Sequence, residues 1–387
     1  MKLLRLPAKK VQLGIPLPWN VRDGNERLLL SKGQVVDSQA QLDALLERGA
    51  FVDFEEAKAA ESLTVAQPSA PTLKRPPNLF SIWDDLPNQM RVLIEGLKDP
   101  AGAEARIGAF VQSLIGLVDK DVDIALYHAV RQENADLFFY GYSHSIHTAV
   151  LSLLMARRLE WPESRIASLM GAAITMNMSM LTLQGQMAKQ DVPIRESQKA
   201  LIRKHPAEAV EWLQKAGITD SEWLRAVMEH HERPDGSGYH QGLKEVAEIA
   251  VALRVTDVFM AKISPRTLRA PLSIREAAKQ LYGEDKGGPL SSAIIKEFGV
   301  FPPGEVVKLV SGEVAVVMRR STNPKHPKVA CIIDNAGRAL AHTLQYDTSN
   351  PEHAIAGSCP PPPNIARLPP ERIYGYAAVG QIANPNP

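Results

Sequence analysis

Six of the ten histidines in the chain lie in sequence contexts where an imidazole can bind a metal ion: His144, His147, His205, His230, His231 and His240. A single histidine on an apolar helical face is more often a packing residue than a ligand, so its neighbours decide the interpretation. The strongest context is the run EHHERPDGSGY from Glu229 to Tyr239. Successive helical residues point about 100° apart, so the two adjacent imidazoles face different directions, which suits a metal cluster with ligands from several segments.

Four other segments carry histidine, aspartate or arginine in an order that matches one known family. SHSIHTAV contains His144, RKHPAEAVEWL contains His205, TDVFMAKIS contains Asp257, and SPRTLRA contains Arg266 and Arg269. Together with HHE and DGSGY, these segments resemble the HD-GYP family, bacterial proteins of the cyclic di-GMP phosphodiesterase type. The resemblance covers about residues 120 to 300.

This resemblance implies both a fold and a chemistry. HD-GYP domains are helical bundles around a site of two or three metal ions, iron or manganese, where a metal-bridging hydroxide attacks the phosphorus of a phosphodiester. The metal ligands that the resemblance implies are His144, His205, His230, His231 and Asp257. The substrate-binding residues that it implies are Asp235, Gly236, Gly238, Tyr239, Arg266 and Arg269. His240 stands where the family usually has proline, and Leu268 where a tyrosine is common.

The His-Asp pair that gives the family its name is replaced. The family segment usually reads AALLHDIGK, whereas this chain reads AAITMNMSM from Ala172 to Met180. Met176 thus replaces the histidine, Asn177 the aspartate and Met180 the lysine. A thioether is a weak donor for iron or manganese, and a neutral amide cannot hold two cations together as a bridging carboxylate does. The three replacements therefore predict lost or impaired hydrolysis.

The remaining ligands form two partial sets by analogy with the family: His144 with Asp257, and His205 with His230 and His231. Three histidines can hold one ion, so the expectation is one divalent metal, iron or manganese, at reduced occupancy, or none. Without a metal, His230 and His231 are expected to be hydrogen-bonded packing residues. Three methionines would then fill the space beside them: Met176, Met178 and Met180.

Three functions stay open at this point. The first is a binding protein in cyclic di-GMP signalling, whose partner is cyclic di-GMP or a protein such as a diguanylate cyclase, with lost or impaired hydrolysis. The second is an active cyclic di-GMP phosphodiesterase with a remodelled site built from His205, His230, His231 and Asp257. The third is a scaffold whose terminal modules bind partners while the helical domain supports them. Whether the chain is an enzyme is thus left open.

A mainly helical fold must position these residues. Apolar residues recur at three- and four-residue spacing, as in IHTAVLSLLMARRL, which predicts an HD-type helical bundle over residues 89–297. Residues 1–56 predict a small α/β module with a hairpin at Asp23-Gly24 and a short helix, LDALLERGAFV, closed by Gly49.

The segments that flank the bundle have different compositions. Residues 57–88 are rich in proline and predict a linker. Residues 298–350 contain two hairpin patterns, turning at Ser311-Gly312-Glu313 and Asn335-Ala336-Gly337, and predict a small β unit. Residues 351–387 predict a disordered tail.

Composition excludes several classes of protein. The 387 residues are 45% hydrophobic and 22% charged, which is ordinary for a globular protein, and the net charge of +1 favours no nucleic-acid partner. The only cysteines are Cys331 and Cys359, so a disulfide framework is not expected, which fits a reducing cytoplasm. No signal peptide follows the basic N-terminus, and no apolar run is long enough to predict a membrane span.

Overall fold

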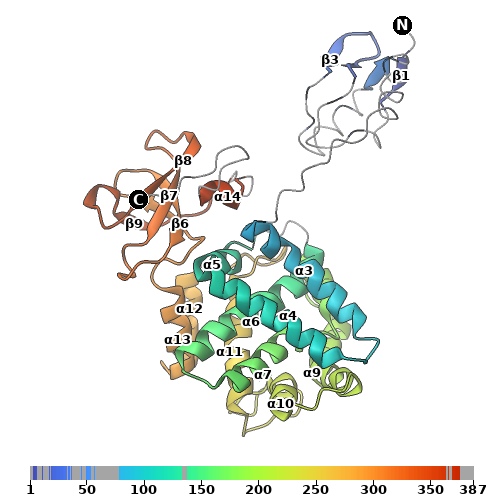
Figure 1. The fold of residues 1–387 in the computed structure, drawn as a ribbon, viewed down its shortest axis with the longest axis vertical. Helices are drawn as coiled ribbons and strands as arrows, with labels where there is room; N and C mark the ends of the chain where they lie inside the picture. Colours follow the sequence, from blue (N-terminus) through green and yellow to red (C-terminus); the bar gives the residue numbers. More distant parts are fainter. Residues whose placement is uncertain are drawn as a thin grey trace. The chain divides into compact units, whose positions relative to one another are not determined.

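The chain divides into two compact units, Met1–Pro76 and Pro77–Pro387, which are drawn in Figure 1. The computed structural model describes the second unit over residues 78–132, 137–362, 365 and 368–374. Of the first unit it describes residues 3–6, 11, 17, 19–32, 34, 36, 45, 49–53 and 56. Each unit is described by itself below.

The first unit contains an antiparallel sheet of four short strands in the order β1-β4-β2-β3. These are β1 (Leu3–Arg5), β2 (Val21–Arg22), β3 (Leu28–Leu30) and β4 (Phe51–Asp53). The predicted hairpin at Asp23-Gly24 is confirmed, since β2 pairs with β3 and the Asp23 carboxylate accepts the Asn25 N–H at 2.8 Å. The predicted helix closed by Gly49 falls largely on residues outside the described ones.

The second unit is a bundle of helices, as the apolar periodicity predicts. Its helices are α3 (Leu79–Gly96), α4 (Ala103–Lys120), α5 (Val122–Arg131), α6 (Tyr140–Arg158), α7 (Glu163–Thr175), α8 (Leu181–Lys189), α9 (Glu196–Lys215), α10 (Ser221–Glu229), α11 (Glu248–Ile263), α12 (Ile274–Glu284) and α13 (Pro289–Phe298). A 3-10 turn, η2 (Leu137–Phe139), precedes α6. No described helix is long and apolar enough to cross a membrane.

The central element of the bundle is α6, which Figure 1 shows running among the other helices. Every residue from Tyr140 to Ala156 is buried. A helix that is buried all round lies in the core of a large domain, so polar residues on it are enclosed by protein. His144 is one of them, and the fold thereby places an imidazole at the centre of the domain.

The bundle begins earlier than the proline content of the sequence suggests. Asn78 caps α3 by accepting the Ser81 N–H at 2.9 Å, so residues 79–88, assigned to the linker, are helical. Pro87 lies inside this helix and removes one backbone donor. The helix persists because its apolar face, which includes Phe80 and Trp83, is buried in the core. Residues 57–77 of the assigned linker lie outside the described residues.

A five-stranded antiparallel sheet follows the bundle, in the order β8-β7-β6-β5-β9. Its strands are β5 (Val306–Leu309), β6 (Val314–Arg319), β7 (Lys328–Ile333), β8 (Ala339–Asp347) and β9 (Ile355–Ser358). Both predicted hairpins are confirmed, β5 with β6 and β7 with β8.

The predicted disordered tail is partly ordered. It contains a 3-10 turn, η3 (Pro351–His353), the edge strand β9, which pairs with β5, and a short helix, α14 (Pro370–Ile373). Tyr374 anchors its far end, because the buried hydroxyl donates to the Met318 carbonyl of β6 at 2.9 Å. Residues 375–387 lie outside the described residues.

Close packing of α7 on α10 depends on one glycine. A Cβ added to Gly171 of α7 would lie 2.8 Å from atoms of the Trp223 ring of α10. The indole Nε1 of Trp223 donates to Thr175 Oγ1 at 2.9 Å, one turn further along α7. This contact holds α10, and hence the histidines that follow it, against the helix that precedes residue 176.

Replacing Gly171→Ala is therefore expected to lower the free energy of unfolding by about 1–3 kcal/mol, because the ring must move in a close-packed core. The matched control is Gly116→Ala on α4, an exposed helical position where an added Cβ meets nothing within 4 Å. That change should raise stability by about 0.5–1 kcal/mol. Urea unfolding followed by circular dichroism measures both; equal stability of Gly171→Ala and the wild type would contradict the packing argument.

Candidate functional site

Three histidines from two segments meet in the core of the bundle. His205 lies in α9, and His230 and His231 directly follow α10. One ring nitrogen from each lies within 4.8 Å of the others. The Nε2 atoms of His205 and His230 are 3.1 Å apart. Among the described residues, this is the one group of three or more histidine, cysteine or carboxylate ligands close enough to share an ion.

Backbone carbonyls fix the direction of two of these rings. Pro206 has no N–H, so the carbonyl of Ile202, one turn earlier, lacks its helical donor; it accepts instead from His205 Nδ1 at 2.6 Å. The Val227 carbonyl, in the last turn of α10, accepts from His230 Nδ1 at 2.7 Å. Because a carbonyl only accepts, both Nδ1 atoms carry the proton and both Nε2 atoms carry a lone pair.

The protonation states of the cluster suit a metal. Burial, reinforced by neighbouring His230, lowers the pKa of His205 to about 3. Burial also lowers the pKa of His230 and of His231. The rings are thus neutral near pH 7, and two lone pairs face each other across 3.1 Å. Two imidazoles bound to one ion at about 2.0–2.1 Å lie roughly 3 Å apart, so the three histidines fit a single ion.

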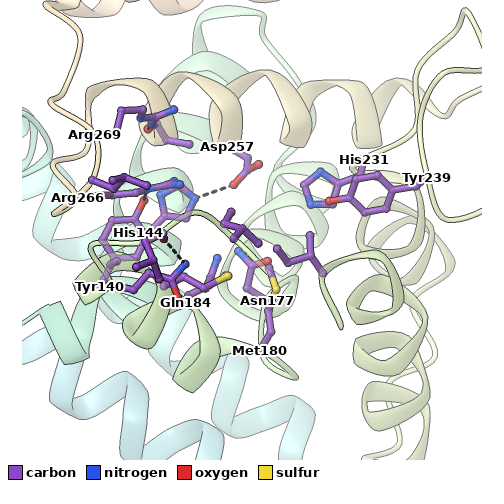
Figure 2. A pocket seen from close by; sticks show the side chains of 18 residues that line it. Tyr140, His144, Asn177, Met180, Gln184, His231, Tyr239, Asp257, Arg266 and Arg269 are labelled. Atoms are coloured by element: carbon purple, nitrogen blue, oxygen red, sulfur yellow. Dashed lines mark hydrogen bonds and ion pairs between the residues drawn. The ribbon is translucent and has the colours of Figure 1, made fainter. Parts of the chain in front are cut away.

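A second pair, His144 of α6 and Asp257 of α11, lies nearby. His144 Nε2 and Asp257 Oδ1 are 2.7 Å apart, as the dashed line in Figure 2 shows. Burial tends to raise the pKa of Asp257, but the hydrogen bond from His144 and the neighbouring imidazoles hold it well below its usual value. Asp257 is therefore an anion whose oxygen is already paired with His144. The structure brings together the members of each set named from the sequence, His144 with Asp257 and His205 with His230 and His231.

Asn177 lies in the turn between α7 and α8 and is only 2% exposed. Its carbonyl oxygen has no hydrogen-bond donor within the described part of the chain. An unsatisfied buried amide costs about 1–3 kcal/mol, and such a group often marks a site that binds something. The neighbouring methionines point in different directions: Met176 is fully buried in the core, Met180 lines the pocket described next, and Met178 lines another cavity.

A cavity of about 420 Å³, here called the central pocket, opens onto these residues. It is lined by Tyr140, His144, Asn177, Met180, Gln184, Met187, Ala188, Gln190, Val192, Ile194, Ile202, His231, Tyr239, Asp257, Ala261, Arg266, Leu268 and Arg269. Figure 2 shows the arginines on one side and the His231 and Tyr239 rings on the other. The central pocket thus combines cationic, aromatic and apolar walls.

The two arginines of the pocket are held by α6 and α11. Arg266 Nε donates to the Tyr140 hydroxyl at 2.9 Å, and its guanidinium lies 5.1 Å from the centre of that ring. Arg269 donates to the backbone carbonyl of Ala261. The backbones of Arg266 and Arg269 are joined by two hydrogen bonds, each N–H donating to the other residue's carbonyl at 3.2 Å, and burial together with the adjacent Arg266 lowers the pKa of Arg269. They form a site where an anion would relieve the repulsion.

The DGSGY segment reaches the pocket through its tyrosine. The Tyr239 ring stacks on His231 with centroids 4.5 Å apart. Gly238 allows this approach, because an added Cβ would lie 2.5 Å from the backbone nitrogen of Arg233. Asp235 instead accepts from the Ser237 N–H and hydroxyl at 2.9 and 2.6 Å, on the surface. Asp235 and Gly236 are not among the residues that line the central pocket, while Gly238 and His240 line a neighbouring cavity.

The chain is similar in sequence to known proteins. Residues 127–287 match the family model described as HD domain. This part of the chain is an HD domain. The chain is 24% identical over 345 residues to cyclic di-GMP phosphodiesterase PA4108 of Pseudomonas aeruginosa, covering 82% of each protein. It is also similar to the solved structure of Bd1817, a HDG"Y"P protein from Bdellovibrio bacteriovorus, at 16% identity and a TM-score of 0.44, over 76% of this chain and 98% of that one. The predicted family is confirmed.

Two glutamates of the HD domain support the site and were not singled out from the sequence. Glu232 is 1% exposed and accepts the backbone N–H groups of Gln241, Gly242 and Leu243 at 2.6, 3.1 and 2.9 Å. Glu229 accepts the Ala247 N–H at 2.7 Å. The sequence places these glutamates directly before and after the two histidines, ahead of a loop with few apolar residues. That position could have indicated carboxylates that hold the loop in place.

His147 was weighed as a ligand and is a packing residue by its surroundings. It is buried on α6, and it does not line the central pocket. Burial, followed by the nearby His128 and His144, lowers its pKa to about 3. His147 is therefore neutral, and His144 is the histidine of α6 that lines the central pocket.

Replacing Glu232→Gln is expected to loosen the loop over residues 241–243 of the HD domain, because one neutral oxygen replaces a carboxylate that accepts three N–H groups. The local free energy of opening should fall by about 1–3 kcal/mol. Hydrogen exchange at the amides of Gln241 and Leu243 measures this. Glu245→Gln, an exposed carboxylate in the same loop, is the control and should leave exchange unchanged; equal exchange in both variants would contradict the assignment.

Proposed function

We propose that this protein is a degenerate HD-GYP protein in cyclic di-GMP signalling, which binds cyclic di-GMP and has lost or strongly impaired phosphodiesterase activity. The observation that carries this proposal is the neutral amide of Asn177 in the wall of the central pocket, beside His144, His231 and Asp257. It stands where the family has a carboxylate that bridges two ions.

The proposal is supported by the electrostatics of a two-metal site. Two unit charges 4 Å apart repel by about 4 kcal/mol at an effective dielectric constant of 20, so two divalent ions repel by about 16 kcal/mol. An amide oxygen offsets none of this, because it carries no net charge. Asp257 is the only acidic residue among those that line the pocket, and it is paired with His144. One carboxylate is too little to hold two ions together.

One ion remains compatible with the residues present. His205, His230 and His231 offer neutral nitrogen donors suited to iron or manganese. When bound there, such an ion would supply charge neutralisation for a phosphate oxygen. Hydrolysis also needs a group that orients the attacking water, and at residue 180 a methionine replaces the family lysine. The three histidines, with Met180 in place of a lysine, therefore support binding of a phosphate ligand better than its hydrolysis.

The ligand class is supported by the walls of the central pocket. Its volume of about 420 Å³ lies within the range of small-molecule sites, roughly 300–1,000 Å³. Arg266 and Arg269 suit a phosphate, and the apolar wall, which includes Met180 and Ile194, suits a base. The relative PA4108 is a cyclic di-GMP phosphodiesterase, which favours cyclic di-GMP over other phosphodiesters.

An active metal-dependent phosphodiesterase with a remodelled site is the second candidate. The facing lone pairs of His205 and His230 favour it, because they suit a resident ion. Asp257, the carboxylate that such a site would recruit, lies outside the group of three histidines close enough to share an ion. Turnover measurements separate this candidate from the first.

Wild-type protein is expected to hydrolyse cyclic di-GMP far more slowly than about 1 s⁻¹, the lower end of typical enzymes, and to hold at most one iron or manganese per chain. Asn177→Asp keeps the side-chain shape and adds the missing charge, so it should raise metal content above that of the wild type. Elemental analysis and a hydrolysis assay measure both. Met178→Leu, in the same turn but facing another cavity, is the control; two ions per chain or rapid turnover in the wild type would overturn the proposal.

Replacing Arg269→Ala should weaken cyclic di-GMP binding by about 10- to 100-fold, since hydrogen bonds to a charged group contribute about 1.5–3 kcal/mol. Isothermal titration calorimetry measures the dissociation constant. Lys279→Ala on α12, an exposed cation outside the pocket, should bind like the wild type. Unchanged affinity of the Arg269→Ala variant would contradict the proposal that cyclic di-GMP binds in the central pocket.

A further inference from the structure

A second cavity has Tyr239 in common with the central pocket. This α9 cavity has a volume of about 670 Å³ and is lined by Glu196, Lys199, Ala200, Arg203, Lys204, Ser237, Gly238, Tyr239, His240, Gln241 and Gly242. Tyr239 belongs to both cavities, and the adjacent residues Ile202 and Arg203 of α9 line one each. The two cavities therefore adjoin at Tyr239.

The charge of the α9 cavity is unbalanced. Three cations of α9 line it, Lys199, Arg203 and Lys204, against the single acid Glu196. Glu196 is already engaged with Lys199, at 2.7 Å. Over the residues that the structure describes, the side chains of Arg203 and Lys204 have no hydrogen-bond or ion-pair partner. Two like charges in one concave wall attract an anion, because it relieves their mutual repulsion.

Two backbone N–H groups beside the α9 cavity are also without a partner in the described part of the chain. Gly238 and His240 both line the α9 cavity. Their N–H groups donate to no acceptor in the described chain, whereas the N–H of Tyr239 between them donates to the His231 carbonyl at 3.3 Å. Backbone N–H groups and guanidinium groups together are the usual contacts of phosphate oxygens.

We propose that the α9 cavity is a second phosphate site, which binds one phosphate of a cyclic dinucleotide while Arg266 and Arg269 bind the other in the central pocket. This inference rests on the proposed function. It adds that the ligand extends past the Tyr239 ring, so that its two phosphates contact separate sets of cations. The α9 cavity has few apolar side chains, which suits a phosphate and ribose, and the base then lies against the apolar wall of the central pocket.

The test compares cyclic di-GMP, which has two phosphates, with guanosine monophosphate, which has one. Replacing Arg203→Ala and Lys204→Ala together should weaken cyclic di-GMP binding at least about 10-fold. The same double variant should change the affinity for guanosine monophosphate, which the central pocket alone can hold, by less than about 3-fold. Calorimetric titration measures both ligands. Both residues are exposed, so the fold should be retained, which thermal unfolding checks.

The matched control removes the same charge elsewhere. Lys279 of α12 and Lys296 of α13 are exposed and line neither cavity, so Lys279→Ala with Lys296→Ala should leave both affinities unchanged. If the wild type binds cyclic di-GMP and the Arg203/Lys204 variant binds it equally well, or loses both ligands to the same extent, the second site is wrong and the proposed function stands. If the wild type does not bind cyclic di-GMP, both are wrong.

Discussion

The site depends on two imidazoles whose lone pairs face each other across 3.1 Å. That arrangement is unfavourable for neutral rings alone, and the helices impose it. Pro206 leaves the Ile202 carbonyl without its helical donor, and the end of α10 leaves the Val227 carbonyl to His230. Each carbonyl accepts a hydrogen bond from the Nδ1–H of a histidine, which leaves its Nε2 facing the other ring. The fold thus fixes the direction of the donor atoms without needing the ion.

The turn over residues 176–180 keeps its contacts with the neighbouring helix and the pocket, but its charges differ from those of the family. The turn over residues 176–180 contacts α9, the helix that carries His205, since Ser179 Oγ donates to the His205 carbonyl at 3.1 Å. Asn177 still lines the pocket beside Asp257. What has changed is charge, because the amide replaces an anion and Met180 replaces a cation. Under the proposed function, the pocket walls made of Arg266, Arg269 and Tyr239 do not depend on that charge and still bind a ligand where a two-metal site cannot form.

Much of this was predictable from local patterns, and the rest depended on tertiary contacts. The hairpins at Asp23-Gly24 and Ser311-Gly312-Glu313 follow from turn residues between apolar runs, and both are present. The start of α3 was missed because its prolines suggest a linker, whereas burial of Phe80 and Trp83 stabilises the helix.

Strand β9 was missed because IAGS is short and precedes four prolines; only its pairing with β5 makes it a strand. Within the site, motif spacing indicated which histidines meet. It could not show that Asp235 turns to Ser237 or that Glu232 holds the following loop, since those depend on which backbone groups become buried.

Met176 and Asn177 also avoid a desolvation penalty that a buried His-Asp pair would have when no metal ion is bound. Residues 176 and 177 are 0% and 2% exposed. A histidine and an aspartate buried there without a metal would leave a charge or an unpaired ring nitrogen in the core, which costs several kcal/mol. Methionine fills the first position as an ordinary core residue, and the neutral amide limits the second to one unsatisfied oxygen. If the protein binds fewer ions than the family site, as the proposed function has it, the Met-Asn pair is the less costly choice for these two buried positions.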